Sequence, residues 1–484
     1  MPRVFRGETT MLEHFRISGL LDEYYANGYG TKQTVIWVAD LVKQLTDRNP
    51  HLNLLEIGAG TGGATKSILR AVGYDFSSYT FTDISSSFFE NAAEAFAQWG
   101  DSVVFKTYNA EIDPLQQGFQ AGAYDVVIAF MVIHACARLD EAMRNLRKLL
   151  KPGGLLILGE GAAGGAMQAG AGFIFGPLPG WWRGVDEGRT LSPLVDVSDW
   201  ESILKRTGFS GIDTMSPSSL FDVFGITLIV STAVDQRVDF IRNPVPAATA
   251  MGLRYKTVVI LGGTSPPVAR LVKTLAGILA PLSETVLNYD SLESMDGQSL
   301  VDPNTVVVSL TDLEQAVFQD ITPERWYKFR CLFETERAIL WLTRGRLEDN
   351  PFCNMTVGFG RSAVHEQENL RLQFLDVPDV SKVDARTIAD TLLRFANESL
   401  YGQDILYTKE PEMLIDVEGC ERVPRLFPVT EANDRINSVE RPIFHQVDIL
   451  DSVVELQRGQ ESCNLRALSR YETSQSLAPR CVSW

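Results

Sequence analysis

The segment 54–65 has the sequence Leu54-Leu55-Glu56-Ile57-Gly58-Ala59-Gly60-Thr61-Gly62-Gly63-Ala64-Thr65. An apolar run stops at a cluster of glycines, and a helical pattern follows from Lys66 to Val72, which predicts a strand, a tight turn and a helix. Glycines in such a turn let the backbone approach a ligand closely, and the amide N–H groups lie at the positive end of the helix. The segment therefore predicts a site for a nucleotide-containing cofactor.

The glycine spacing leaves two cofactors open. Gly58, Gly60 and Gly62 give G-x-G-x-G, and Gly63 stands where a dinucleotide fingerprint has its third glycine. The turn alone fits either a nicotinamide or an S-adenosylmethionine (SAM) enzyme. Asp83 ends the next apolar run, 79–82, and its carboxylate would bind ribose hydroxyls in both cases.

Composition excludes several classes of protein. The 484 residues suffice for two or three domains, and the net charge of -17 argues against a nucleic-acid partner. No apolar run approaches the roughly 18 residues of a membrane span, so we expect no membrane partner. The cysteines, at 136, 331, 353, 420, 463 and 481, form no C-x-x-C pair. We therefore expect reduced thiols in a cytoplasmic protein, with no metal site.

Strands and helices alternate from residue 51 to about 160. The expected strands are Leu52–Ile57, Tyr79–Asp83, Val103–Tyr108, Tyr124–Met131 and Gly154–Gly159, and the last helix is Asp140–Leu150. This alternation predicts a parallel, doubly wound α/β sheet, which binds its ligand beyond the carboxyl ends of the strands. His134 follows the fourth strand and Glu160 the fifth. If those strands are neighbours, both side chains open onto the ligand crevice.

The segments that flank this region leave alternatives open. Two N-terminal stretches, Met11–Tyr25 and Thr34–Leu45, have apolar residues at helical spacing and form either a helix pair on the core or a lid over the cofactor. The adjacent Trp181 and Trp182 line an acyl pocket or cap the core. Gly211–Met215 and Gly225–Ser231 are predicted to be an antiparallel pair that closes the sheet.

A second alternating region begins near residue 255. Its expected elements are the strands Lys256–Leu261, Thr305–Leu310 and Ala338–Leu342 and the helix Ala269–Leu279. Two prolines in its first turn, Gly262–Pro267, remove N–H donors that would bind a pyrophosphate, and the chain has no Tyr-x-x-x-Lys pair. We therefore expect a non-catalytic domain, preceded by a linker at 233–254 and followed by a polar tail whose last twenty residues are disordered.

Ordered matches across both regions make the chain resemble one family. The matching stretches are Leu54–Thr65, Asp113-Pro114 with Gln117-Gly118-Phe119, His134-Ala135, Leu149–Gly154, Gly180-Trp181-Trp182, Leu340-Trp341-Leu342-Thr343 and Val423-Pro424-Arg425-Leu426. With these stretches the chain is similar to the C-methyltransferase region and the following structural half of the ketoreductase, the pseudo-ketoreductase, of fungal highly reducing polyketide synthases.

The resemblance implies a class I SAM-dependent methyltransferase with a Rossmann-like sheet, followed by a second, truncated Rossmann-like domain. The expected boundaries are a helical lid at 1–50, the methyltransferase core at 51–232, the linker at 233–254, the pseudo-ketoreductase at 255–440 and the tail at 441–484. It implies methylation of the α-carbon of a β-ketoacyl thioester on the acyl carrier protein of a polyketide synthase. Because synthase and carrier motifs are missing, we expect a free-standing protein that meets its carrier in trans.

The resemblance also implies the site residues. His134 and Glu160 match the catalytic His/Glu pair, although a lone His after a strand is otherwise more often a core or turn residue. Tyr25 would help to enclose the enolate or the sulfonium. The residues expected to bind the cofactor are Glu56, Gly58, Gly60, Gly62, Asp83, Asn109 and Ala110. The chain departs from the family at Tyr108-Asn109-Ala110, where Leu-Asp-Ile is usual, and at Met131, where a polar residue is usual.

Three functions remain open from the sequence. The chain is an active C-methyltransferase, a catalytically silent scaffold of a polyketide synthase, or a methyltransferase-fold cyclase that uses SAM as a passive positive charge. Basic residues that could dock an acidic carrier, or form only a solvated face, are Arg138, Arg144, Arg147, Lys148 and Lys151.

Overall fold

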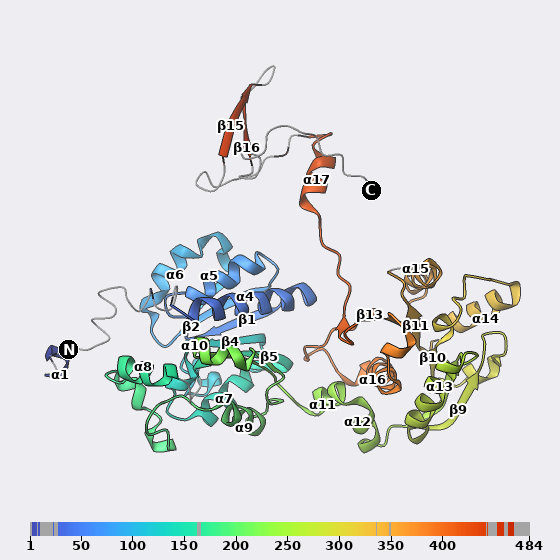
Figure 1. The fold of residues 1–484 in the computed structure, drawn as a ribbon, viewed down its shortest axis with the longest axis horizontal. Coiled ribbons are helices and arrows are strands. Elements are labelled where there is room, and N and C mark those ends of the chain that lie inside the picture. Colours follow the sequence, from blue (N-terminus) through green and yellow to red (C-terminus); the bar gives the residue numbers. More distant parts are fainter. Residues whose placement is uncertain are drawn as a thin grey trace. The chain divides into compact units, whose positions relative to one another are not determined.

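The computed structural model describes residues 2–6, 8–9, 23, 28–161, 166–334, 336–347, 350–441, 443, 453–458 and 463–468. The chain divides into two compact units, Met1–Pro424 and Arg425–Trp484. The first unit holds two seven-stranded sheets, one built from residues before 233 and one from residues after 254 (Figure 1). We call these two parts of the first unit the first half and the second half.

The first sheet has the strand order β3-β2-β1-β4-β5-β7-β6. Its strands are β1 Asn53–Ile57, β2 Ser78–Asp83, β3 Val103–Thr107, β4 Tyr124–Phe130, β5 Leu150–Gly161, β6 Thr214–Met215 and β7 Ile226–Thr232. The first five are parallel, and β7 pairs antiparallel with both β5 and β6. The predicted strands, the doubly wound sheet and the antiparallel closing pair are confirmed, with small shifts at strand ends.

Helices cover both faces of this sheet, α4, α5 and α6 on one and α7 and α9 on the other (Figure 1). The bounds are α4 Thr31–Arg48, α5 Gly63–Val72, α6 Phe89–Ala95, α7 Leu139–Leu149, α8 Ala166–Phe175, α9 Val197–Arg206 and α10 Ser218–Phe224, with the short α1 at Pro2–Phe5. Val35, Val38 and Val42 of α4 are buried in the core beside α5. The N-terminal segments were expected to pack on the core or to form a lid over the cofactor, and α4 packs on the core. The other stretch, 11–25, lies almost wholly outside the described residues.

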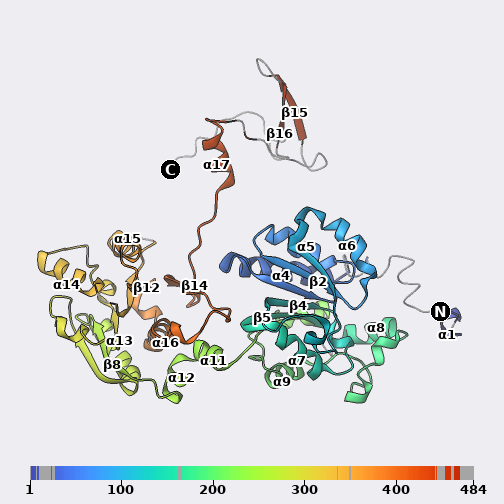
Figure 2. The same cartoon turned by 180° about the vertical axis from the view of Figure 1, so that it is seen from behind.

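The second sheet has the order β14-β13-β12-β11-β10-β8-β9 and is parallel except for β14. Its strands are β8 Tyr255–Leu261, β9 Ser283–Tyr289, β10 Thr305–Ser309, β11 Ala338–Arg344, β12 Arg371–Val377, β13 Glu412–Ile415 and β14 Glu421–Arg422. One face carries α13 Pro266–Leu279 and α16 Ala385–Ala396, and the other carries α14 Pro323–Phe333 and α15 Pro351–Glu366 (Figure 2). The expected second Rossmann-like sheet is confirmed.

The segment predicted to be a linker differs from that expectation. Residues 233–254 contain α11 Gln236–Arg242 and α12 Pro244–Ala250, and Val238, Phe240 and Ala248 are buried in the core of the second half. Asn243-Pro244 indicated a loop, but Pro is also well suited to the first turn of a helix, where its missing N–H has no intrahelical acceptor. The segment is therefore folded onto the second sheet.

The second unit contains α17 Thr430–Asn437 and an antiparallel hairpin of β15 Val453–Arg458 and β16 Cys463–Leu468. Part of the stretch expected to be disordered, 465–468, thus belongs to a strand, and residues 469–484 lie outside the described residues. Among the helices described in the ranges above, none is both long and apolar enough to cross a membrane.

Candidate active site

The glycine turn lies between β1 and α5, and its three glycines have different reasons to be glycine. Gly58, Gly60 and Gly62 all have positive φ angles, of 65°, 55° and 79°. A Cβ on Gly58 would lie 2.4 Å from a methyl carbon of Val132, and one on Gly62 would lie 3.0 Å from the ring of Phe96. A Cβ on Gly60 would meet only the carbonyl oxygen of Gly58, at 4.0 Å. Gly60 is therefore where a ligand can approach the backbone.

Glu56 lies beneath this turn instead of on its open side. Its carboxylate is 2% exposed and accepts hydrogen bonds from the hydroxyls of Thr65, at 2.5 Å, and Tyr79, at 2.6 Å. Burial raises the pKa of Glu56, although both hydroxyl donors act in the opposite direction. The sequence assigns Glu56 to the cofactor, which stays a prediction; in the structure its carboxylate joins β1 to β2 and to the first turn of α5.

Asp83, at the end of β2, lies against the open part of the turn. One carboxylate oxygen accepts the N–H of Gly60 at 3.1 Å, and the other accepts the N–H of Ser85 at 2.9 Å. Each carboxylate oxygen can accept a further hydrogen bond. The predicted proximity of Asp83 to the glycine turn is thus present, with an acceptor for hydroxyl groups beside Gly60.

The loop after β3 holds Asn109 and Ala110 by short-range contacts. The Oδ1 atom of Asn109 accepts the N–H of Glu111 at 3.0 Å, and its backbone N–H and C=O both bind the side-chain amide of Gln117. The carbonyl of Ala110 accepts a hydrogen bond from Asn145 of α7 at 2.9 Å. In the described part of the chain the amide nitrogen of Asn109 has no hydrogen-bond partner, so it is available as a donor.

His134 and Glu160 are in direct contact. Nδ1 of His134 lies 2.5 Å from Oε2 of Glu160, whose side chain is fully buried, while the His134 side chain is 15% exposed. The other carboxylate oxygen accepts three backbone N–H groups, from Val132 at 3.2 Å, Ile133 at 2.7 Å and His134 at 3.3 Å. The pairing of β4 with β5 brings the two residues together, as the sequence expected if these strands were neighbours.

The contact determines which nitrogen of His134 is free. An ionised carboxylate only accepts hydrogen bonds, so a neutral imidazole paired with it carries its proton on Nδ1 and leaves the lone pair of Nε2 free. The turn η4, Ile133–Ala135, places the three N–H donors around the same carboxylate. Glu160 therefore holds both the ring and the backbone of His134, and the arrangement differs from a core histidine whose ring is satisfied by backbone groups.

Trp181 and Trp182 have different surroundings. Trp181 is buried and stacks on Phe175, with ring centroids 6.0 Å apart, whereas Trp182 is 46% exposed and donates to the carbonyl of Gly176. Trp181 therefore packs in the core. For the exposed Trp182, a role in an acyl pocket stays a prediction. Tyr25 lies outside the described residues.

The basic residues proposed for carrier docking are mostly engaged within the chain. Lys148 pairs with Asp113 and Lys151 with Asp125, both at 2.6 Å, and Arg144 pairs with Asp140 at 3.4 Å. Arg147 binds the carbonyls of Gly208, Leu150 and Val234. These contacts favour a structural role over a free docking patch.

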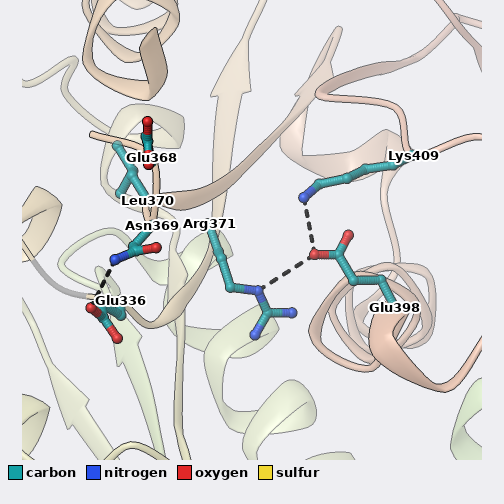
Figure 3. Close-up of a pocket in the computed structure, with 7 residues that line it drawn as sticks. All are labelled: Glu336, Glu368, Asn369, Leu370, Arg371, Glu398 and Lys409. Carbon is teal, nitrogen blue, oxygen red and sulfur yellow. Dashed lines mark hydrogen bonds and ion pairs between the residues drawn. The ribbon is translucent and has the colours of Figure 1, made fainter. Parts of the chain in front are cut away.

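A hollow of about 340 Å³ in the second half is unrelated to this site (Figure 3). It is lined by Glu336, Glu368, Asn369, Leu370, Arg371, Glu398 and Lys409. Lys409 and Arg371 both pair with Glu398, at 2.9 and 3.5 Å. It lies at the start of β12, whereas parallel sheets bind ligands beyond the carboxyl ends of their strands.

Comparisons with known proteins agree with this geometry. Residues 55–156 match a family model described as a methyltransferase domain. The chain is 68% identical over 475 residues to the highly reducing polyketide synthase bet1 of Neocamarosporium betae, covering 98% of this chain and 16% of the relative. It is 66% identical over 479 residues to sthA of Phaeosphaeria nodorum, covering 99% and 17%. The chain thus spans about a sixth of the length of these relatives.

Two solved structures resemble about half of the chain. The trans-methyltransferase CalH, in complex with SAH, is 33% identical, covers 48% of this chain and 64% of its own, and has a TM-score of 0.42. The CMeT domain of the citrinin polyketide synthase is 26% identical, covers 48% and 62%, and has a TM-score of 0.43. Of the two cofactors that the glycine spacing left open, the match to a methyltransferase domain favours SAM. Over nearly all of its length the chain is therefore similar to one region of fungal highly reducing polyketide synthases, and residues 55–156 form a methyltransferase domain.

Proposed function

We propose that the chain transfers the methyl group of SAM to the α-carbon of a β-ketoacyl thioester on an acyl carrier protein of a polyketide synthase, including a carrier supplied in trans. The observation that carries this proposal is the contact of His134 with the buried Glu160, 2.5 Å apart. Both residues lie at the carboxyl ends of neighbouring parallel strands, the edge at which the glycine turn also lies.

The residues of the turn fit SAM. Gly60 offers open space beside the backbone, Asp83 offers carboxylate oxygens for the ribose hydroxyls, and Asn109 offers an amide donor for the adenine edge. The N–H groups at the start of α5 lie at the positive end of that helix. Gly58 and Gly62 act indirectly, because their missing Cβ atoms let Val132 and Phe96 pack against the turn.

His134 is the general base of the proposed reaction. The proton between a ketone and a thioester is acidic enough for the neutral Nε2 of His134 to remove it. Glu160 keeps the tautomer with a proton on Nδ1 and stabilises the imidazolium that forms. The three N–H groups on the other oxygen of Glu160 offset the cost of its buried charge. SAM, when bound, supplies the methyl group that the enolate carbon accepts.

Intact-mass analysis tests the proposal. A β-ketoacyl carrier protein incubated with the chain and SAM should gain one methyl group, and His134→Ala should abolish the gain while calorimetry still detects SAM binding. The matched control is His365→Ala, an exposed histidine of α15, which should retain wild-type turnover. Unchanged turnover in His134→Ala would remove this residue from the mechanism.

The same assay separates the alternative functions. Loss of both methyl gain and SAM binding would select the scaffold, and a converted product of unchanged methyl content would select the cyclase. We also propose that residues 255–440 are a catalytically silent pseudo-ketoreductase. The N–H groups of Gly263, Thr264 and Ser265, which would bind a pyrophosphate, instead donate to the carboxylate of Glu314. Binding of a nicotinamide dinucleotide to the full chain, measured by fluorescence, would contradict this proposal.

A further inference from the structure

Arg189, between η6 (Val185–Glu187) and α9, has an unusual set of partners. Its side chain is 8% exposed, and its guanidinium donates to four backbone carbonyls. The acceptors are the carbonyl oxygens of His134 at 2.8 Å, Cys136 at 2.6 Å, Ala137 at 3.0 Å and Pro193 at 3.0 Å. Three of the four carbonyls thus belong to the turn that carries His134.

The chemistry of these groups explains why an arginine is present. Carbonyl oxygens that converge on one point create a negative potential, and a guanidinium presents donors in a rigid planar fork that can bind several of them at once. A lysine ammonium has three donors around a single nitrogen and cannot span the same set. Among the residues that the structure describes, the one carboxylate paired with Arg189 is that of Glu187, at 3.4 Å, so carbonyls supply most of the compensation for its burial.

Arg189 and Glu160 hold opposite sides of the same turn. Glu160 accepts the N–H groups of residues 132, 133 and 134, and Arg189 donates to the C=O groups of residues 134, 136 and 137. The backbone of His134 therefore contributes its N–H to one charged group and its carbonyl to the other. The position of the imidazole depends on both.

The neighbouring loop, 183–193, packs closely against the guanidinium of Arg189. A Cβ on Gly184 would lie 2.3 Å from Cζ of Arg189. Glu187 also accepts the N–H of Leu139 at 3.2 Å, and Arg183 pairs with Glu111, which accepts the N–H of Ala137. The loop that follows Trp181 and Trp182 is thus joined at several points to the segment 134–139.

We propose that Arg189 is a positioning residue for the methyl transfer: it fixes the turn 134–137 so that the imidazole of His134 stays against Glu160, and it links this geometry to the loop 183–193. The inference rests on the proposed function. Arg189 acts through His134 and contacts no reacting atom.

Arg147 provides a matched control. Its guanidinium also binds three backbone carbonyls, those of Gly208, Leu150 and Val234, and none of them belongs to the segment 132–139. A general structural role for carbonyl-binding arginines predicts similar effects of Arg147→Lys and Arg189→Lys. A positioning role predicts that only Arg189→Lys affects the chemistry.

The test uses the full chain and four proteins: wild type, Arg189→Lys, Gly184→Ala and Arg147→Lys. Gly184→Ala keeps the arginine but forces a methyl group against it, so it serves if Arg189→Lys does not fold. Three quantities are measured: kcat for methyl gain, exchange of the substrate α-proton with D2O in the absence of SAM, and backbone hydrogen exchange of the peptide 131–139.

Arg189→Lys and Gly184→Ala should lower kcat and α-proton exchange by the same factor, about 10- to 100-fold, because small displacements of a catalytic group have effects of this size. SAM affinity should stay within about 2-fold, since the glycine turn is untouched, and the peptide 131–139 should exchange faster. Arg147→Lys should keep kcat within about 2-fold of wild type.

Wild-type kcat with unchanged exchange in both Arg189→Lys and Gly184→Ala would overturn the inference, as would an equal loss of kcat in Arg147→Lys. If the wild type itself transfers no methyl group, the proposed function fails. Hydrogen exchange of 131–139 still decides in that case whether Arg189 holds the turn, so the two failures are distinguishable.

Discussion

Two carboxyl groups of the second half, Asp312 and Glu314, are close in sequence but have opposite electrostatic environments. Asp312 is 1% exposed and accepts one hydroxyl, from Thr356 at 2.7 Å, and one N–H, from Val317 at 3.0 Å. Glu314 is half-buried and accepts N–H groups from the turn that begins α13. Burial raises the pKa of Asp312 to about 6. The two groups should therefore affect stability in opposite directions as the pH changes.

Asp312→Asn should remove one contribution to the pH dependence of stability, the one that favours the folded chain at low pH. The folded pKa of Asp312, about 6, lies above its ordinary value of 3.8, so its contribution to stability is complete below pH 4 and is lost as the pH rises through 6. A shift of this size corresponds to about 3 kcal/mol. The change in unfolding free energy from pH 4 to pH 7.5, measured by urea unfolding, should be more positive in the variant than in the wild type by about this amount. Parallel pH curves for wild type and variant would contradict the prediction, and the exposed Asp101→Asn is the control.

Glu314→Gln should destabilise the second half above the ordinary pKa of a glutamate. Burial opposes ionisation of Glu314, but the backbone N–H donors outweigh it and hold the pKa of this carboxyl below its usual value. Its contribution is thus present at neutral pH and is lost as the pH falls through the folded pKa. Replacing charge-assisted hydrogen bonds by neutral ones should cost about 1–2 kcal/mol at pH 7 in denaturant unfolding. The exposed Glu324→Gln should cost little, and an equal cost would refute the assignment.

At the scale of elements, the connection from β4 to η4 brings His134 into contact with Glu160. We call these two residues the dyad. Met131, between them, has a φ angle of 54°, which is uncommon for a residue with a side chain. Its N–H donates to the carbonyl of Gly159 on β5 at 2.7 Å. This left-handed residue redirects the chain so that the next three N–H groups converge on Glu160. Strain of this kind persists where the surrounding structure holds it.

An alanine variant is usually more stable than a glycine variant at the same position, and we expect the reverse order of stability at Met131. A left-handed conformation costs a residue with a Cβ about 1–2 kcal/mol, and glycine avoids this cost. Met131→Gly should therefore be more stable than Met131→Ala by about 1 kcal/mol in thermal or urea unfolding. The same pair at the exposed Glu141 of α7 should show alanine more stable, as in ordinary helices. Alanine more stable than glycine at both positions would show that Met131 is not strained.

At the scale of the whole molecule, the segment 401–410 connects the second half to the first. The N–H of Leu406 donates to the carbonyl of Pro152 at 2.8 Å, Thr408 donates to Asn49, and Glu410 pairs with Arg48 at 3.8 Å. Lys409 of the same segment pairs with Glu398 in the hollow of the second half (Figure 3). Pro152 lies within β5, the strand that ends beyond Glu160. The second half thus supports the strand that carries one member of the dyad.

Gly153→Ala should weaken this connection. A Cβ at residue 153 would lie 2.6 Å from the carbonyl oxygen of Leu406. Gly118 has the same φ angle, 78°, and open space around it, so Gly118→Ala has the conformational cost without the clash. We expect Gly118→Ala to lower the unfolding free energy by about 1 kcal/mol and Gly153→Ala to lower it by more. Only Gly153→Ala should show faster backbone hydrogen exchange at residues 401–410. Equal losses would mean that the contact at Leu406 contributes nothing.

Local patterns were sufficient for the strands of the first sheet, for three strands of the second sheet and for the placement of His134 and Glu160 after strands of the first sheet. Apolar runs and glycine turns act over a few residues, and alternation of strands and helices leaves few arrangements of a parallel sheet. The same patterns could not decide the secondary structure of residues 236–250, because Asn243-Pro244 is compatible both with a loop and with the first turn of a helix. The side chains of α11 and α12 are buried by packing against the second half, whose residues lie far away in the sequence.

The roles of Glu56, Arg147 and Arg189 were not predictable from their neighbours in the sequence. Their partners lie up to 87 residues away, as Val234 does from Arg147, and nothing within a few residues indicates which carbonyl or hydroxyl a buried side chain will bind. The sequence could place a carboxylate before the glycine turn, but only the packing of β2 and α5 gives it the hydroxyl groups of Tyr79 and Thr65 as partners. Propensities and turn preferences are local, whereas burial and hydrogen-bond partners come from segments that meet only after folding.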